Sequence, residues 1–379
     1  MSGVPLSFIE VNVGIVAPGT NSTSHPYPSS RMILSTFAIN SADAQFCSAI
    51  TNFPHAFAKE VIPNAKCGKL VIAEQNWASA ELMANVDKII LEKGYGCEVE
   101  LVPGATMPTF TSMNDKGTPD MNPEQWANAV YEPLKKAVAE KRIFVANKAP
   151  ITGLGEGWWI TPGTVKKYPQ IKNMTALEIL EHPEWFPDKE DPSKGAFVGC
   201  PAGWGCQLAN ANLFRAFEME KKGWVLIDPG SAAGLDGTIS KAADSGSPWF
   251  GYYWNPTSMV GKYGLISVDF GVKFHSRDNW DNCITLAEQD CADPKPTAWT
   301  KSEVNSIVTA NFAKTGGKDA LKYVKKRTYP GDVMNSMLVY MADNQAKGSD
   351  AAVEFLKQHE GVWGKWVSSA AKKKIKAGL

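Results

Sequence analysis

The sequence predicts an α/β protein with two lobes joined by two crossings of the chain, and three observations carry this prediction. Residues 67–102 show the pattern strand, helix, strand, which is a βαβ unit and predicts a parallel sheet. The glycine-rich residues 153–157 and the apolar residues 304–308 fit two crossings between lobes. A chain of 379 residues is long enough for two domains of ordinary size. Two lobes joined by two strands form a hinge beside a cleft, where ligands bind.

The domain boundaries follow from these crossings. We expect residues 66–154 and 304–379 to form lobe I, and residues 155–303 to form lobe II. Residues 1–65 precede the first predicted strand as an N-terminal extension. The first part of this extension, residues 1–30, is rich in Pro, Gly, Ser, Thr and Asn, a composition typical of disorder.

Hydrophobic periodicity predicts the elements of the first lobe. Apolar residues recur at helical spacing after Trp77, from Ala80 to Leu91, and Gly94 ends this helix. The alternation of residues 97–102 predicts a strand beside the apolar strand of residues 67–73. Further along we expect a loop with a short helix at residues 103–125. A helix at residues 131–134 and a strand at residues 143–146 follow.

The second lobe and the C-terminal part are predicted from similar signals. Thr175 and Glu178 form a capping-box pattern, which marks the start of a helix. A further helix is expected at residues 210–220, and the C-terminal third is helical, with Trp363 and Trp366 in its core. Strands are expected at residues 158–160, 196–199 and 248–254.

One loop, residues 200–206, has an unusual composition. Two cysteines, Cys200 and Cys206, bracket Trp204, which lies between two glycines. Glycine lacks a Cβ, so a ligand can approach this backbone closely. An indole face attracts cations, and free backbone N–H groups beside it can hold an oxygen of the same molecule. The loop therefore suits a small ligand with a soft cationic end and an oxygen end.

The same residues carry a family resemblance. Gly203-Trp204-Gly205-Cys206 after Cys200 resembles the glycine betaine/proline betaine substrate-binding proteins of bacterial ABC transporters. The resemblance extends from about Lys66 to the C-terminus and is most specific over residues 200–206 and 250–256. It implies a type II periplasmic-binding-protein fold, a cleft in which tryptophans surround a trimethylammonium group, and no enzymatic activity.

Four tryptophans match the cage that this resemblance implies. Trp204 lies in the loop of residues 200–206, called the central loop below, and Trp254 follows an aromatic strand. Trp126 precedes a helix, and Trp77 corresponds to an extra cage tryptophan of the related choline-binding proteins. A trimethylammonium group donates no hydrogen bond and spreads its charge over methyl groups, so indole faces suit it. The alternative for each tryptophan is packing in the core.

The residues for the oxygen end depart from the family pattern. Betaine binders often place a histidine four residues after the first-lobe tryptophan, where this chain has Val130. The backbone N–H groups of Gly205 and Cys206 remain as donors. The lost donor favours a smaller oxygen end, as in trimethylamine N-oxide, which would be held by Glu124 or Glu132. Glycine betaine, proline betaine and choline are the alternative ligands.

The seven cysteines indicate a secreted protein with disulfides. Six of them fall into pairs close in sequence, Cys67 with Cys97, Cys200 with Cys206, and Cys283 with Cys291. Reduced thiols in a cytosolic protein are the alternative. The seventh, Cys47, lies where we expect a divergent signal sequence, within residues 31–58, with a cleavage site at residues 56–58.

Together with the cysteines, the family resemblance implies a periplasmic, monomeric binding protein that delivers its ligand to an ABC permease. The zero net charge gives no argument for nucleic acid, and we expect neither nucleic acid nor a cofactor to bind. No apolar run reaches the length of a membrane-spanning helix. A sensor module with the same cleft but another partner is a rival interpretation.

Cysteine-based catalysis and metal binding are two other interpretations of the sequence. A cysteine-nucleophile enzyme would use Cys200 or Cys206 with His182 or His275 as the base, but a disulfide explains the two cysteines better. No cysteine spacing fits zinc, so we expect no metal of that kind. The acidic residues Asp188, Glu190 and Asp191 suggest either a calcium site or, as the simpler interpretation, a solvated turn.

Overall fold

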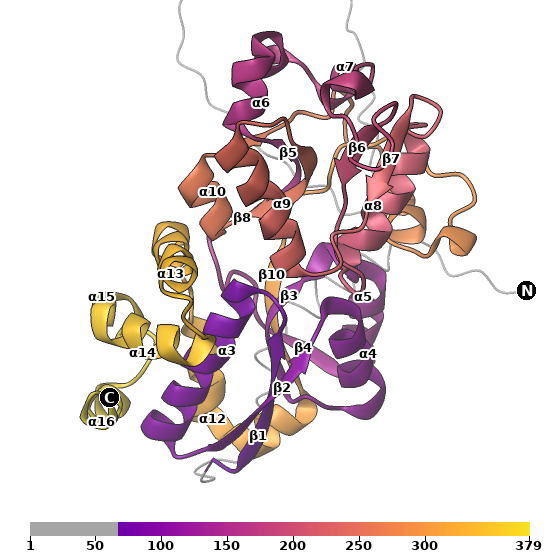
Figure 1. Ribbon diagram of the computed structural model, residues 1–379. Helices are drawn as coiled ribbons and strands as arrows, with labels where there is room; N and C mark the ends of the chain where they lie inside the picture. The colour runs from indigo at the N-terminus through magenta and orange to yellow at the C-terminus, as the bar shows by residue number, and fades with distance from the viewer. Residues whose placement is uncertain (1–66) are drawn as a thin grey trace, which may run out of the picture. The chain divides into compact units, whose positions relative to one another are not determined.

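The computed structural model describes residues 67–379, in which two five-stranded sheets are covered by helices (Figure 1). These residues fall within one compact unit. The expectations for the N-terminal extension, the signal sequence and Cys47 lie outside the described residues. Between residues 67 and 379, no helix is long and apolar enough to cross a membrane.

The first sheet contains strands from both ends of the described chain. Its strand order is β2-β1-β3-β10-β4. The strands are β1 (Lys69–Gln75), β2 (Glu98–Gly104), β3 (Met121–Trp126), β4 (Ile143–Asn147) and β10 (Val304–Thr309).

The predicted βαβ unit is confirmed, but the sheet is mixed and not parallel throughout. Strand β1 pairs in parallel with β2 from Lys69↔Glu98 to Gln75↔Gly104, and also with β3. Strand β10 runs antiparallel to both β3 and β4. A helical crossover between neighbouring strands returns the chain in the same direction, whereas β10 re-enters the first sheet only after the chain has passed through the second.

The two faces of the first sheet pack against different helices, as β4 illustrates. Phe144 and Ala146 join a core with residues of α3, α12, α13 and α14, whereas Ile143 and Val145 join a core with residues of α4 and α5. This alternation follows from the two-residue period of a strand. The helices of this part are α3 (Ala78–Ile89), α4 (Thr106–Lys116), α5 (Tyr131–Ala139), α12 (Ala310–Lys326), α13 (Gly331–Asn344), α14 (Gly348–Gln358), α15 (Glu360–Trp363) and α16 (Ser369–Gly378). The short helical segments of residues 67–379 are η1 (Ile90–Tyr95), η2 (Ala127–Ala129), η3 (Pro169–Asn173), η4 (Pro183–Trp185), η5 (Trp280–Ile284) and η6 (Glu288–Asp290).

The sequence pattern of residues 103–125 predicts a loop with a short helix, but the structure forms strand β3 at its end. All six residues of Met-Asn-Pro-Glu-Gln-Trp are buried, although Pro and Asn are poor strand formers. The polar side chains are satisfied inside the protein: Asn122 accepts from Gln75 at 2.7 Å and donates to Gln125 at 2.9 Å. Tertiary hydrogen bonds therefore override the local preference.

The second sheet has the order β7-β6-β8-β5-β9. Strand β6 is parallel to β7 and β8, while β5 is antiparallel to β8. The strands are β5 (Gly155–Ile160), β6 (Gly195–Val198), β7 (Trp224–Ile227), β8 (Phe250–Asn255) and β9 (Ile266–Ser267). The helices are α6 (Pro162–Lys167), α7 (Ala176–Ile179), α8 (Gly205–Ala216), α9 (Ala232–Ser245), α10 (Ser258–Tyr263) and α11 (Arg277–Asn279).

Several local predictions for this part are confirmed and others are corrected. The capping box of Thr175 and Glu178 is present at the start of α7. The helix expected at residues 210–220 begins earlier, at Gly205, because Trp204 adopts the extended conformation of an N-cap. Strand β7 and helix α9 were not predicted. The chain enters this sheet at β5 and returns to the first sheet at β10, while the expected lobe boundaries themselves stay a prediction.

All three expected disulfides are present. Cys67 and Cys97 join the starts of the neighbouring strands β1 and β2, with their Cα atoms 4.6 Å apart. Cys200 and Cys206 close the central loop, and Cys283 and Cys291 close a segment after residue 270. The six thiols of the described residues are thus all paired.

Candidate ligand-binding pocket

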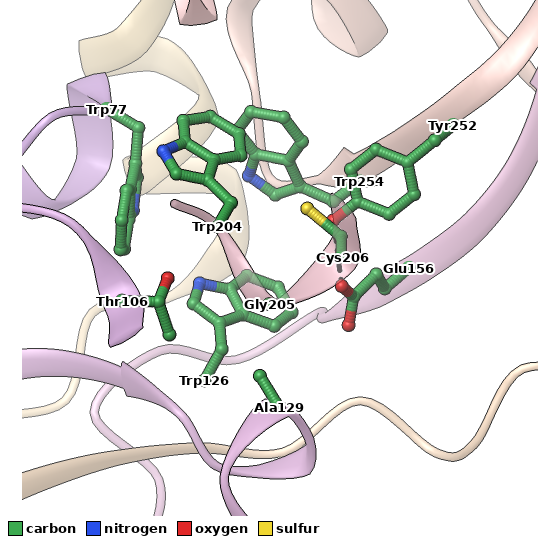
Figure 2. A pocket seen from close by; sticks show the side chains of 10 residues that line it. All are labelled: Trp77, Thr106, Trp126, Ala129, Glu156, Trp204, Gly205, Cys206, Tyr252 and Trp254. Carbon is green, nitrogen blue, oxygen red and sulfur yellow. Dashed lines mark hydrogen bonds between the residues drawn. The ribbon is translucent and has the colours of Figure 1, made fainter. Parts of the chain in front are cut away.

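A pocket forms where residues of the first sheet meet residues of the second (Figure 2). The empty space within it, including the part that is open to solvent, is about 330 Å³. The four tryptophans expected to form a cage line it together with Gly205 and Cys206. The complete lining is Trp77, Thr106, Trp126, Ala129, Glu156, Trp204, Gly205, Cys206, Tyr252 and Trp254.

Each cage tryptophan lies at the end of a strand or at the start of a helix. Trp77 follows β1 and is the N-cap of α3, and Trp126 ends β3. Trp204 follows the loop after β6 and is the N-cap of α8, and Trp254 is the next-to-last residue of β8. In sheets of this class, ligands bind at the carboxyl ends of the strands, and the cage lies at these ends.

The indole rings meet edge to face around Trp204, which lies between two of the others in Figure 2. Its ring centroid is 5.4 Å from that of Trp77, at an interplanar angle of 73°, and 5.3 Å from that of Trp254, at 79°. This edge-to-face geometry is one that aromatic pairs prefer. The four tryptophans are 4% to 9% exposed, so a ligand between them is shielded from water.

Hydrogen bonds fix three of the four indoles. The Nε1 atoms of Trp77 and Trp126 both donate to Glu124 Oε1, at 2.8 and 3.0 Å. Trp204 Nε1 donates to Asn76 Oδ1 at 2.8 Å. Because Asn76 follows β1 while Trp204 follows β6, this bond also joins the two sheet regions.

Glu124 lies behind the cage and does not line the pocket, in contrast to the expectation that it contacts the ligand. Its Oε1 accepts a third hydrogen bond, from the Ser79 hydroxyl at 3.0 Å. The side chain is completely buried, and burial raises the pKa of this carboxyl to about 7 against the lowering effect of its three donors.

Glu156 and Tyr252 line the pocket and were not predicted. The Tyr252 hydroxyl donates to Glu156 Oε1 at 2.7 Å, and Asn128 Nδ2 donates to Glu156 Oε2 at 2.8 Å. Burial raises the pKa of Glu156, and the two donors oppose this. Two signals could have found them: Glu156 is the one charged residue of its strand, and Tyr252 shares a face with Trp254 two residues later.

The structure does not bring Glu132 into the pocket. Its carboxylate pairs with Lys135 Nζ at 3.4 Å, and its side chain is 42% exposed. Val130, where betaine binders often carry a histidine, is buried in a core with Phe110 and Leu134. It offers no donor, so the oxygen end of a ligand must be met by other groups.

The glycines of the central loop allow a close approach between the two sheet regions. A Cβ added to Gly205 would lie 2.2 Å from the Cβ of Ala129, far inside van der Waals contact. Gly203 has a φ of 84°, a conformation that favours glycine. The first N–H groups of α8, at Gly205 and Cys206, have no partner within the helix and lie beside the pocket.

Residues 67–379 contain neither a free cysteine nucleophile nor a cluster of calcium ligands at the places where the sequence suggested them. Cys200 and Cys206 are joined in a disulfide, so neither is a free nucleophile. Asp188 Oδ2 accepts from the backbone N–H groups of Glu190 and Asp191, which is the geometry of a turn, and no group of three metal-ligating side chains occurs in these residues.

Residues 68–358 match a family that is described as the substrate binding domain of ABC-type glycine betaine transport system. A glycine betaine/proline betaine-binding periplasmic protein of Salmonella typhimurium is 25% identical over 170 residues, which are 44% of this chain and 46% of that protein. The matched region thus spans less than half of the length of the curated relatives.

Solved structures of two binding proteins are similar over most of the chain. The glycine betaine and L-proline-binding protein of Borrelia burgdorferi has a TM-score of 0.62 at 16% identity, covering 81% of this chain and 99% of that chain. An ABC-transporter choline binding protein in complex with choline has a TM-score of 0.61 at 15% identity, covering 82% and 98%. These likenesses show the fold, which is the predicted two-lobed α/β fold of periplasmic binding proteins.

Proposed function

This chain belongs to the family of substrate binding domains of ABC-type glycine betaine transport systems, and we propose that it captures a trimethylammonium-type solute for import. Members of this family are substrate-binding components and not enzymes. The ligand we favour is trimethylamine N-oxide.

The observation that carries the proposal is the convergence of Trp77, Trp126, Trp204 and Trp254 on one shielded pocket. A trimethylammonium group is weakly hydrated and has no hydrogen to donate, so its attraction to indole faces is its main specific interaction. Each desolvated contact of this kind contributes about 2 kcal/mol. Four such faces select for the methylated cation over lysine-like cations, whose ammonium would lose its hydrogen bonds to water.

The polar end of the pocket favours trimethylamine N-oxide over glycine betaine. Glu156 is a carboxyl group in the lining, and it would repel the carboxylate of a betaine. An N-oxide has a single oxygen, which can share a proton with Glu156 while accepting from the N–H groups of Gly205 and Cys206. This replaces the expected roles of Glu124 and Glu132.

Choline is the second candidate, because its hydroxyl can donate to the same carboxylate. A ligand of this class would close the two sheet regions around itself, and the closed form would be recognised by an ABC permease. We further propose that the protein works as a monomer in the periplasm, the compartment named for the curated relatives.

Tryptophan fluorescence tests the proposal, since four indoles line the pocket. The protein is titrated with trimethylamine N-oxide, glycine betaine, choline and the uncharged isostere of choline, in which carbon replaces nitrogen. We expect saturable changes with at least one methylated ammonium compound and far weaker binding of the isostere. Equal binding of choline and its isostere would contradict a cation-binding cage.

A further inference from the structure

We propose that Glu124 is a positioning residue whose negative charge, acting through Trp77 and Trp126, strengthens the attraction of the cage for a cation. This inference rests on the proposed function, because it concerns how the same pocket gains affinity. It assigns to Glu124 a role without ligand contact.

The geometry places one carboxylate oxygen behind two cage walls. Glu124 Oε1 accepts from Trp77 Nε1 at 2.8 Å and from Trp126 Nε1 at 3.0 Å, so both indoles are held by the same atom. Ser79 provides the third donor, and it comes from the same helix that Trp77 caps. The other oxygen, Oε2, is buried without a hydrogen-bond partner. The two indole planes are therefore fixed relative to each other.

An ionised acceptor also changes the indoles electronically. A hydrogen bond to a charged acceptor is stronger than one to a neutral acceptor and polarises its donor. Electron density moved from the N–H toward the ring makes the ring face more negative, which is the property that attracts a cation. Trp204 offers an internal comparison, because its N–H donates to the neutral side chain of Asn76.

Among residues 67–379, Glu124 is in no salt bridge. Arg327 favours its ionised form only at longer range, because the Arg327 guanidinium pairs with Asp87, with Nε 3.2 Å from Oδ1. Arg327 Nη2 donates to the carbonyl of Pro123 and to the Ser306 hydroxyl rather than to Glu124. The other titratable groups around this cluster are Tyr323, Tyr329 and, on the pocket side, Glu156.

A bound cation in the cage would further stabilise the ionised form of Glu124. The carboxyl of Glu124 has its pKa raised to about 7, so it changes charge near neutral pH. A cation in the cage favours the ionised form, and by linkage the ionised form favours the cation. Affinity for a permanent cation should therefore rise with pH through this range.

The test compares two ligands of one shape in three proteins. Dissociation constants of choline and of its uncharged carbon isostere are measured below and above pH 7 for wild type, E124Q and N76A. The ratio of the two constants reports only the contribution of ligand charge. Substitution E124Q keeps an acceptor for the indoles but removes the charge, whereas N76A removes a neutral acceptor from Trp204.

In wild type we expect the preference for choline over the isostere to increase with pH. In E124Q we expect this preference to be roughly tenfold lower above pH 7. We also expect it to lose its increase across pH 7, which is called the pH step below. N76A should weaken both ligands alike and keep the wild-type ratio. Substitution E156Q serves as a second comparison and should keep a pH step, since Glu124 remains.

The outcomes separate the two proposals. If E124Q weakens choline and the isostere equally, or leaves both unchanged, the inference is wrong while the cage stands. A pH step that disappears in E156Q but persists in E124Q also overturns it. If wild type binds no methylated ammonium compound, the proposed function itself fails.

Discussion

Trp254 and Glu156 are direct partners in the antiparallel pair of β5 and β8, and both line the pocket. Opposite residues of such a pair present their side chains on the same face of the sheet. Tyr252, two residues before Trp254, shares that face and donates to Glu156 at 2.7 Å. One patch of sheet therefore supplies an aromatic wall and a carboxyl group side by side, which suits a ligand with a cationic end and a small oxygen end.

The ligand preference should depend on Glu156. Substitution E156Q removes a negative charge from the lining while keeping an acceptor for Tyr252. We expect glycine betaine to gain affinity relative to trimethylamine N-oxide by roughly tenfold, because charge repulsion with its carboxylate is removed. Competition binding of the two ligands to wild type and variant measures this ratio. An unchanged ratio would mean that Glu156 does not meet the oxygen end.

Removing one cage wall should weaken binding strongly. For W204A we expect a loss of about 2 kcal/mol or more, which is roughly a thirtyfold rise in the dissociation constant. Trp185 is the matched control, because it stacks on His182 with ring centroids 3.9 Å apart and does not line the pocket. Substitution W185A should leave affinity unchanged. Equal effects of the two substitutions would return Trp204 to a packing role.

The contact between Gly205 and Ala129 should control closure. In G205A the new Cβ would lie 2.2 Å from the Ala129 Cβ, so the two sheet regions could not approach as they do here. Overpacking of this kind costs about 1–3 kcal/mol, and we expect affinity to fall roughly fivefold to 150-fold. The double variant G205A/A129G removes the 2.2 Å contact and leaves the Cα of residue 129 at 3.3 Å, which a small backbone shift relieves. We expect the double variant to recover affinity, as measured by calorimetry. If it does not, the contact between residues 205 and 129 does not control closure.

Glu124 should make the stability of the ligand-free protein depend on pH. Burial raises the pKa of its carboxyl from 4.5 to about 7, so the folded state holds this proton more tightly than the unfolded state does. The free energy of unfolding of wild type should therefore decrease, relative to that of E124Q, as pH rises from about 4.5 to about 7. Over this pH range the stability of wild type relative to E124Q should change by about 3 kcal/mol in total, because each pKa unit corresponds to about 1.4 kcal/mol. Urea unfolding of both proteins across this range checks it, and a difference independent of pH would rule it out.

The sequence predicts the parts of the fold and site that local pattern encodes. Helix α3 follows from apolar residues at helical spacing, and the pairing of β1 with β2 follows from the βαβ pattern that brings Cys67 beside Cys97. The motifs around Trp204 and Trp254 are specific enough that each tryptophan could be matched to one of the cage tryptophans of the family.

The remaining features depend on contacts between distant segments. Strand β3 is polar and contains Pro123, so only its burial between β1 and β10 explains its conformation. Glu156 becomes part of the pocket because β5 pairs with β8, and Glu132 stays outside because its helix turns it toward Lys135. Neither outcome is visible in local sequence. The antiparallel direction of β10 likewise depends on where the chain comes from.

The most direct test of the tryptophan cage is a calorimetric titration of the protein with trimethylamine N-oxide, glycine betaine and choline in turn. We predict saturable heat with every ligand that fits the cage, with trimethylamine N-oxide bound more tightly than glycine betaine. Tighter binding of glycine betaine would contradict the assigned role of Glu156. No heat with any of the three would contradict the cage itself and leave the four tryptophans as core residues.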